Sequence, residues 1–245
     1  METRKIDIPF FKYVSMGNDF IVIENIDISP TQIKKMCLEK WGISADGILL
    51  LKKEKEQWKL TIYNADGSKA KMCGNGLKVI GAYLKRKEPN QNEWDVYIDK
   101  RKYHIKKERQ GISVQVPFPK RIKIENHEVV YNVGNLHRMI ESVWDDALEM
   151  QIAKAHPKEN ISFYQIIKEG RIAIRTFERG VGFTYSCGSA SLAVAAHYFK
   201  MHPQIKKVSI ITRGGIYKIE KNKHDLLLKG KVKCVFIGRY INEVS

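Results

Sequence analysis

The sequence contains no run of apolar residues that approaches the roughly 20 needed to cross a membrane. Its first residues, METRKIDIPFFKY, also lack the apolar centre of a secretory signal. These two absences predict a cytoplasmic protein. The length of 245 residues, with 43% hydrophobic residues, is sufficient for one large domain or two small ones that enclose an apolar core.

Cysteine is scarce, with four residues in the whole chain, at positions 37, 73, 187 and 234. No two of them have the CxxC spacing typical of zinc sites, so we expect no metal. Four cysteines in a chain of this length are also too few for a disulfide scaffold. Reduced thiols are therefore expected, and we interpret Cys37 and Cys234 as packing residues.

Acidic residues are few, 27 against 43 basic ones, and the formal net charge is +16. A balance of this kind is one sign of a polyanionic partner. The basic residues are spread along the chain, however, and no helix-turn-helix, zinc-finger or aromatic-basic RNA-binding pattern is present. We expect no nucleic acid partner, and a basic nucleic-acid-binding protein is the remote alternative.

Strand patterns dominate the chain and few segments predict helices, which indicates an α+β protein. One long strand is predicted from Arg121 to Val133. Helices are predicted in four places: from Pro30 to about Lys40, after Cys73 to about Arg86, from about Trp144 to Ala155, and after Cys187.

Two segments 114 residues apart resemble each other. Residues 73–85 read CGNGLKVIGAYLK and residues 187–199 read CGSASLAVAAHYF, so each has Cys-Gly, a polar or small residue, and then an apolar helix. At the same shift Asn64 aligns with Glu178. The repeat predicts two related halves, residues 1–118 with Cys73 and residues 119–245 with Cys187, the last strand returning to the first half.

A thiol at a helix N-terminus lies at the positive end of the helix dipole, beside unpaired backbone N–H groups. Both effects predict that the pKa of each thiol is lowered toward neutrality. Glycine after each cysteine lets an anion approach those N–H groups. Two such thiols suit removal of the α-proton of an amino acid on one face and its return on the other, with no pyridoxal cofactor. Small buried residues, or a regulatory disulfide, are the alternatives.

Several motifs in order along the chain match one known family. They are FKYVSMGNDF at 11–20, NADGS at 64–68, MCGNG at 72–76, GNLH at 134–137, ERGVG at 178–182 and CGS at 187–189. On these motifs the chain resembles the diaminopimelate epimerases, cofactor-independent two-cysteine enzymes of lysine and peptidoglycan precursor biosynthesis. The resemblance implies epimerisation of LL-2,6-diaminopimelate to the meso form, without a cofactor, by a homodimer.

The resemblance also implies a fold and a set of site residues. The fold would have two pseudo-symmetric lobes, each a curved, mostly antiparallel sheet around a central helix, with the active site in the cleft between them. Catalytic roles would fall to Cys73, Cys187, Glu178 and His137. Substrate-binding roles would fall to Asn18, Asn64, Gly74, Asn75, Asn135, Asn160, Arg179, Gly188 and Ser189.

The chain departs from the family pattern at a few positions. Leu136 stands where proline is usual, Phe183 where glutamate is usual, Ala190 where glycine is frequent, and Lys78 where arginine is common. The cysteine pair is unchanged, so the departures bear on the substrate more than on the chemistry. A racemase or epimerase of the same fold that acts on a different amino acid is therefore the alternative.

Overall fold

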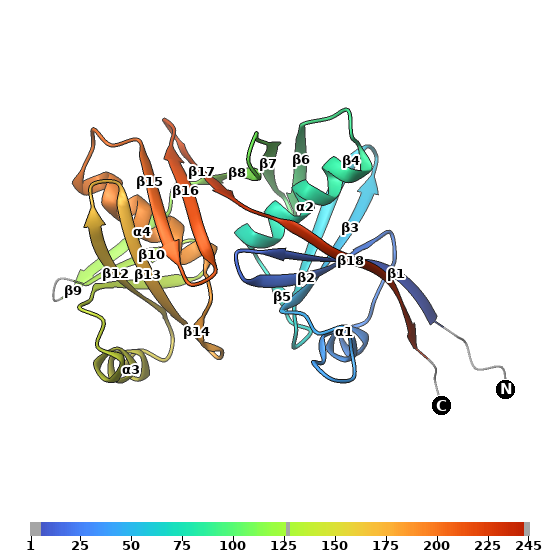
Figure 1. Cartoon of the computed structure of the whole chain (residues 1–245), viewed down its shortest axis with the longest axis horizontal. Coiled ribbons are helices and arrows are strands. Elements are labelled where there is room, and N and C mark those ends of the chain that lie inside the picture. The colour runs from blue at the N-terminus through green and yellow to red at the C-terminus, as the bar shows by residue number, and fades with distance from the viewer. Residues whose placement is uncertain (1–5, 126–127, 243–245) are drawn as a thin grey trace. The chain divides into compact units, whose positions relative to one another are not determined.

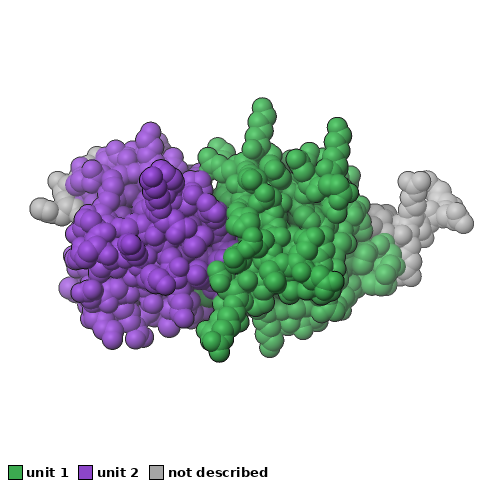
Figure 2. All heavy atoms as spheres, turned by 90° about the horizontal axis from the view of Figure 1, so that it is seen from above, with its two compact units in different colours: residues 1–112, 231–245 green, residues 113–230 purple. Residues whose placement is uncertain are grey.

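The computed structural model describes residues 6–125 and 128–242, and within them the chain forms two compact units. Unit 1 comprises residues 1–112 together with 231–245, and unit 2 comprises residues 113–230 (Figure 2). The described residues form four helices and many strands, as an α+β protein requires (Figure 1). The predicted fold class is confirmed.

Unit 1 is a mixed sheet in the order β18–β1–β2–β3–β4–β6–β7, with the short β5 paired to the end of β4. The pairs β2/β3 and β4/β6 are parallel and the others antiparallel. The strands are β1 Ile6–Ser15, β2 Asn18–Glu24, β3 Gly47–Glu54, β4 Gln57–Asn64, β5 Lys69–Ala70, β6 Glu93–Ile98, β7 Arg101–Lys107 and β18 Lys233–Asn242.

Two helices pack on this sheet. Helix α1 (Pro30–Cys37) starts with a capping box, in which Ser29 and Gln32 exchange side-chain and backbone hydrogen bonds, and it lies against β3. It ends three residues before the predicted end at Lys40. Helix α2 (Gly74–Lys87) packs against β1, β2 and β7, and its first eight residues are all buried. Figure 1 shows α2 along the inside of the curved sheet.

Unit 2 repeats this architecture in the order β9–β10–β11–β12–β13–β15–β16–β17–β8, with β14 paired to the end of β13. Helix α4 (Gly188–Met201) packs against β11, β12, β15, β16 and β17, and helix α3 (Asp146–Ala155) against β12. The strands are β8 Ile112–Pro117, β9 Lys120–Glu125, β10 Glu128–Asn132, β11 Leu136–Glu141, β12 Asn160–Lys168, β13 Arg171–Glu178, β14 Gly182–Thr184, β15 Lys207–Thr212, β16 Gly215–Lys221 and β17 Asp225–Gly230.

The strands of unit 2 from β9 to β16 correspond in order to those of unit 1 from β18 to β7, and β17 and β8 extend the sheet of unit 2. The parallel pairs β11/β12 and β13/β15 of unit 2 occupy the positions that β2/β3 and β4/β6 occupy in unit 1. The buried helix follows the short strand in each, α2 after β5 and α4 after β14. The repeat found in the sequence is therefore a repeat of structure, and the prediction of two pseudo-symmetric α+β lobes is confirmed.

One strand prediction was wrong. The segment Arg121–Val133 forms two strands, β9 and β10, which pair with each other as a hairpin whose connection falls at residues 126–127, outside the described residues. A further strand, β11, follows and pairs with both β10 and β12. Alternating side chains mark a strand but not the point where it turns back, so two paired strands that lie close together in the sequence resemble one long strand. Among the described residues, no helix is long and apolar enough to span a membrane.

Candidate active site

Cys73 is the N-cap residue of α2, as predicted. Its backbone is extended, and its Sγ accepts a hydrogen bond of 3.3 Å from the backbone N–H of Gly76. A Cβ at Gly76 would lie 3.0 Å from Cδ2 of Leu49, which is a tight contact, and 3.6 Å from Sγ of Cys73, which is an ordinary one. The sulfur therefore lies against the first backbone N–H groups of a buried helix, where negative charge is favoured.

A chain of hydrogen bonds connects the start of α2 to the turn between β1 and β2. Asn75 donates from Nδ2 to Oδ1 of Asn18 at 2.6 Å, and Asn18 donates to Oδ2 of Asp46 at 3.3 Å. Asp46 also accepts from the backbone N–H of Asp19 at 2.9 Å, and Asp19 forms an ion pair of 2.8 Å with the buried Lys12. The structure thus brings Asn18 and Asn75 into one network at the start of the helix that Cys73 caps. Asp46, in the ADG segment before β3, is a supporting residue that the sequence reasoning missed.

Asn64 lies elsewhere in unit 1, at the exposed end of β4 opposite Gly47. Its Nδ2 donates to Oγ of Ser68 at 2.9 Å, and Ser68 in turn donates to the carboxylate of Asp66. Asn64 therefore shapes the turn that leads through β5 to Cys73.

Lys78 is fully buried on α2, five residues after Cys73. Burial lowers the pKa of Lys78 to about 7, and the negative charge of ionised Cys73 acts in the opposite direction. A buried ammonium group is costly unless a negative group compensates it. The arginine common at this position in the family pointed to a cation here, but nothing in the sequence pattern showed that it would be buried.

Cys187 occupies the N-cap position of α4, but within the described residues its side chain makes no capping hydrogen bond of the kind that Cys73 makes at α2. Its Sγ lies 3.2 Å from Oγ of Ser189. Burial, and then the negative charge of Glu178, raise the pKa of the Cys187 thiol well above its ordinary value, against the hydrogen bond to Ser189. The prediction that the pKa of both thiols is lowered was wrong for Cys187. Desolvation and a neighbouring carboxylate outweigh the helix terminus here.

Glu178 ends β13 and is positioned by the short β14. Its Oε1 accepts a hydrogen bond of 2.7 Å from the hydroxyl of Thr184, and Glu178 pairs with Gly182 across the two strands. Tyr217 donates a hydrogen bond of 3.0 Å to the hydroxyl of Ser186, the residue before Cys187. The residues before Cys187 are therefore tied to both β13 and β16.

Asn160 connects the remaining predicted residues of unit 2. It is largely buried at the start of β12, donates to the carbonyl oxygen of Leu136 at 3.1 Å, and accepts from the backbone N–H of Arg179 at 3.0 Å. It pairs with His137, whose Nε2 lies 3.0 Å from Oδ1 of Asn135. Four predicted residues therefore belong to one network, namely Asn135, His137, Asn160 and Arg179. The network holds the exposed Arg179 in place through its backbone N–H group.

His137 is fully buried, and burial lowers its pKa to about 3. It is therefore a neutral imidazole at neutral pH. The Oδ1 atom of Asn135 can only accept a hydrogen bond, so Nε2 of His137 carries the proton and donates a hydrogen bond to it. Nδ1 has no hydrogen-bond partner among the described residues.

Phe183, which replaces the usual glutamate, packs beside a small core. Its ring centroid lies 6.2 Å from that of Phe163 and 5.4 Å from that of Phe177. The guanidinium of Arg175 lies 5.5 Å from the Phe183 ring and 5.5 Å from that of Trp144. Phe183 is thus a packing residue of unit 2.

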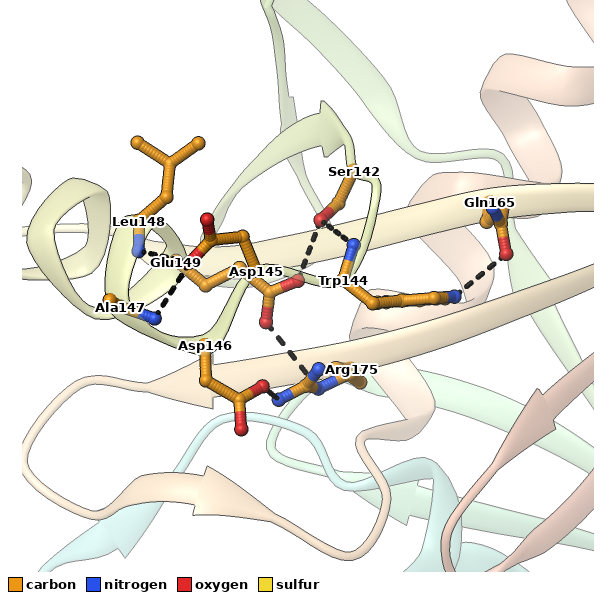
Figure 3. A network of polar contacts seen from close by, with 9 residues as sticks. All are labelled: Ser142, Trp144, Asp145, Asp146, Ala147, Leu148, Glu149, Gln165 and Arg175. Atoms are coloured by element: carbon orange, nitrogen blue, oxygen red, sulfur yellow. Dashed lines mark hydrogen bonds and ion pairs between the residues drawn. The ribbon is translucent and has the colours of Figure 1, made fainter.

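Arg175 also holds α3 to the sheet (Figure 3). It forms ion pairs with Asp146 and with the buried Glu149, the latter at 3.4 Å. Ser142 donates to the other oxygen of Glu149 at 2.6 Å, and the indole N–H of Trp144 donates to Gln165 at 2.7 Å. Arg175 is therefore paired with two carboxylates of α3 and lies beside the Phe183 ring.

Within the described residues, no three His, Cys, Asp or Glu side chains are close enough together to hold a metal ion. All four cysteines lie in this part of the chain and form no disulfide. Cys73 and Cys187 are free cysteines at the N-termini of their helices.

The chain matches known proteins along nearly its whole length. A family profile described as Diaminopimelate epimerase matches residues 10–139 and 150–235. The diaminopimelate epimerase of Flavobacterium psychrophilum is 30% identical over 92% of this chain and 97% of its own, and that of Archaeoglobus fulgidus is 28% identical over 94% and 95%. A hydroxyproline epimerase from Agrobacterium vitis, solved with bound trans-4-hydroxy-L-proline, has a TM-score of 0.69, with 12% identity over 99% of this chain and 94% of its own.

Proposed function

The chain belongs to the diaminopimelate epimerase family, which makes it an isomerase, and from this premise we propose that it converts LL-2,6-diaminopimelate into the meso form. Both the lysine pathway and peptidoglycan precursor synthesis use that product, and we place the enzyme in the cytoplasm. One observation carries the proposal: each unit presents a cysteine as the N-cap of its buried central helix.

In the proposed mechanism the two sulfur atoms reach opposite faces of one α-carbon. A thiolate takes the α-proton while the electron pair stays on carbon, and the other thiol gives a proton to the opposite face. The backbone N–H groups of Gly74, Asn75, Gly188 and Ser189 stabilise the negative charge that develops on the reacting carboxylate. Because both protons move between sulfur and carbon, the reaction needs no pyridoxal cofactor.

The other predicted residues bind and orient the substrate in this proposal. Glu178 holds the reacting α-amino group, and neutral His137 supports the site through Asn135. The distal amino-carboxylate end is bound by the remaining polar side chains, which are those of Asn18, Asn64, Asn135, Asn160 and Arg179. The supporting observation is that Asn160 fixes the backbone of Arg179, and a planar guanidinium so placed suits a carboxylate.

A second candidate is epimerisation of another amino acid by the same two thiols. The hydrophobic Phe183 in place of the family's glutamate favours it, since a carboxylate is lost next to the segment that leads to Cys187. The fold is compatible with either substrate, because a hydroxyproline epimerase shares it.

Incubation in D2O separates the two candidates. The enzyme is mixed in separate reactions with LL-diaminopimelate, L-proline, trans-4-hydroxy-L-proline and a panel of other L-amino acids, and deuterium at the α-carbon is measured by mass spectrometry. We expect deuterium in diaminopimelate, together with formation of the meso isomer. Deuterium in a different amino acid alone would refute the diaminopimelate assignment.

We also propose that the enzyme is a homodimer that associates through β18. This strand is paired on one side with β1, and Val235, Phe236, Ile237 and Ile241 are each about half exposed. A long apolar strand of this kind at a sheet edge promotes aggregation unless another chain covers it. Sedimentation should give a dimer for the unaltered chain and a monomer for Phe236→Lys; a monomer in both cases would refute the proposal.

A further inference from the structure

Lys78 has a position on α2 that brings its charge to Cys73. Side chains of an α-helix lean toward its N-terminus and cover the residues three and four positions earlier, which here are Asn75 and Gly74. Cys73 directly precedes these two residues as the N-cap. The Lys78 side chain is fully buried, so it does not turn to solvent, and Cys73 is the residue whose charge acts on its ammonium group.

Several of the other charged groups near α2 have partners of their own. Lys12 pairs with Asp19 at 2.8 Å, Glu24 with Lys87 at 2.7 Å, and His104 with Asp95 at 2.9 Å. The titratable and charged side chains on the strands that pack against α2 are Asp7, Lys12 and Tyr13 on β1, Asp19 and Glu24 on β2, and Arg101, Lys102, Tyr103, His104, Lys106 and Lys107 on β7. Among them, no group is a cause of the lowered pKa of Lys78, which arises from burial.

The two units differ in charge at positions that the 114-residue repeat makes equivalent. The 114-residue shift that aligns Cys73 with Cys187 aligns Lys78 with Leu192, which is also fully buried. The same shift aligns the neutral Asn64 with the anionic Glu178. A cation favours an ionised thiol and an anion opposes it, so both differences favour thiolate at Cys73 and thiol at Cys187.

We propose that Lys78 is a positioning residue that holds Cys73 as a thiolate before substrate binds, so that Cys73 is the base and Cys187 the acid of the resting enzyme. The roles of base and acid rest on the proposed function, whereas the charge state of Cys73 does not. In the forward step the Cα–H bond breaks, an S–H bond forms on Cys73, and Cys187 delivers its proton to carbon. Cys187 is then the thiolate, beside Glu178, and its return to the thiol form is favoured by the same charges.

Alkylation of Cys73 tests this without any substrate. The folded protein is treated with iodoacetamide at a series of pH values, and the rate of modification at Cys73 is followed by peptide mass spectrometry. The rate follows the thiolate fraction, so its midpoint in the unaltered protein should lie below about 8.5, the value of a free cysteine. Lys78→Met should raise the midpoint by about 1 or more and slow modification at pH 7 roughly tenfold.

Two further variants separate charge from structure. Lys78→Arg keeps the charge and should keep the midpoint of the unaltered protein. Lys71→Met removes the same charge from an exposed position two residues before Cys73 and should leave the midpoint unchanged, since exposed charges are screened by water. Circular dichroism confirms that each variant is folded.

An unchanged midpoint in folded Lys78→Met would overturn the proposal. So would a midpoint at or above that of free cysteine in the unaltered protein, a result that needs no variant to fold. If the midpoint moves as expected but diaminopimelate is not epimerised, the proposed function fails while the effect of Lys78 on Cys73 stands.

Discussion

Asn75 donates a hydrogen bond of 2.6 Å from its Nδ2 to Oδ1 of Asn18, and so ties the start of α2 to the first residue of β2. Asn75 is nearly fully buried. The bond joins two of the predicted substrate-binding residues, which are 57 positions apart in the chain. This hydrogen bond therefore couples the position of the N-terminus of α2 to that of the turn between β1 and β2.

That coupling is measurable by a double-mutant cycle. We expect Asn75→Ala to lower the free energy of unfolding by about 1–3 kcal/mol, because it removes one partner of a buried pair. The cycle of Asn18→Ala with Asn75→Ala should give a coupling energy of about 1 kcal/mol in urea unfolding. Strictly additive effects would show that the two side chains act independently.

Cysteine replacements should divide into two classes. Cys73→Ala and Cys187→Ala each remove one of the two proton carriers, and we expect kcat for epimerisation to fall by at least about 10³. Cys37→Ala and Cys234→Ala are matched controls on α1 and β18 and should keep nearly full activity. Activity near that of the unaltered enzyme in Cys73→Ala or Cys187→Ala would contradict the two-base mechanism.

His137 should make the protein sensitive to acid. Its pKa is lowered to about 3 by burial, whereas an unfolded histidine has a pKa near 6.5. Between these values the unfolded chain binds a proton that the folded chain does not, so stability contributed by neutral His137 is present above about pH 6.5 and is lost as the pH falls toward 3. Urea midpoints at pH 7, 6 and 5 should fall more steeply for the unaltered protein than for His137→Gln. An equal decrease of the urea midpoint with pH in the two proteins would contradict the assignment of His137 as a buried neutral imidazole.

Phe183→Leu separates packing from substrate recognition. The change removes the ring contacts of Phe183 with Phe163 and Phe177, and also its contact with the guanidinium of Arg175. We expect a loss of about 1–2 kcal/mol in the free energy of unfolding, with kcat and KM within about twofold of their original values. A large change of KM with unaltered stability would instead assign Phe183 to the substrate.

The buried Arg138 should stabilise the start of β12, where Asn160 lies. It forms ion pairs with Glu128 at 2.5 Å and with Glu159 at 2.6 Å, and Glu159 immediately precedes Asn160. Glu159→Gln leaves the guanidinium with less compensation, so we expect a loss of about 2–3 kcal/mol in urea unfolding. KM should rise as well, since Asn160 holds the backbone of Arg179. Unchanged stability would show that Glu128 alone compensates Arg138.

The sequence predicted the parts of this protein that depend on local pattern. The helix starts at Cys73 and Cys187 could be predicted from neighbouring residues alone. A small polar residue followed by glycine and an apolar run is a local pattern that indicates a helix N-terminus. The α+β class and the internal repeat follow from periodicity for the same reason. The family motifs then selected residues that the structure does join within each unit, such as Asn18 with Asn75 and Asn160 with Arg179.

What the sequence did not predict depends on contacts between distant segments. Asp46 supports Asn18 from 28 positions away, and no local pattern marks that contact. The raised pKa of Cys187 arises from burial and from Glu178, both of which oppose the helix terminus that the sequence displays. Burial of Lys78 follows from the sheet wrapped around α2, whereas in the sequence the residue resembles an ordinary helix-surface lysine.

The pairing of β18 with β1, from Ile6 opposite Asn242 to Val14 opposite Lys233, has a consequence for the synthesis of the chain. Unit 1 contains residues from both ends of the described chain, so a ribosome must finish unit 2 before the sheet of unit 1 can be completed. Until then, β1 presents one unpaired edge, which is prone to association with other nascent chains. The half of the protein that carries Cys73 is therefore the first to be translated and the last to finish folding.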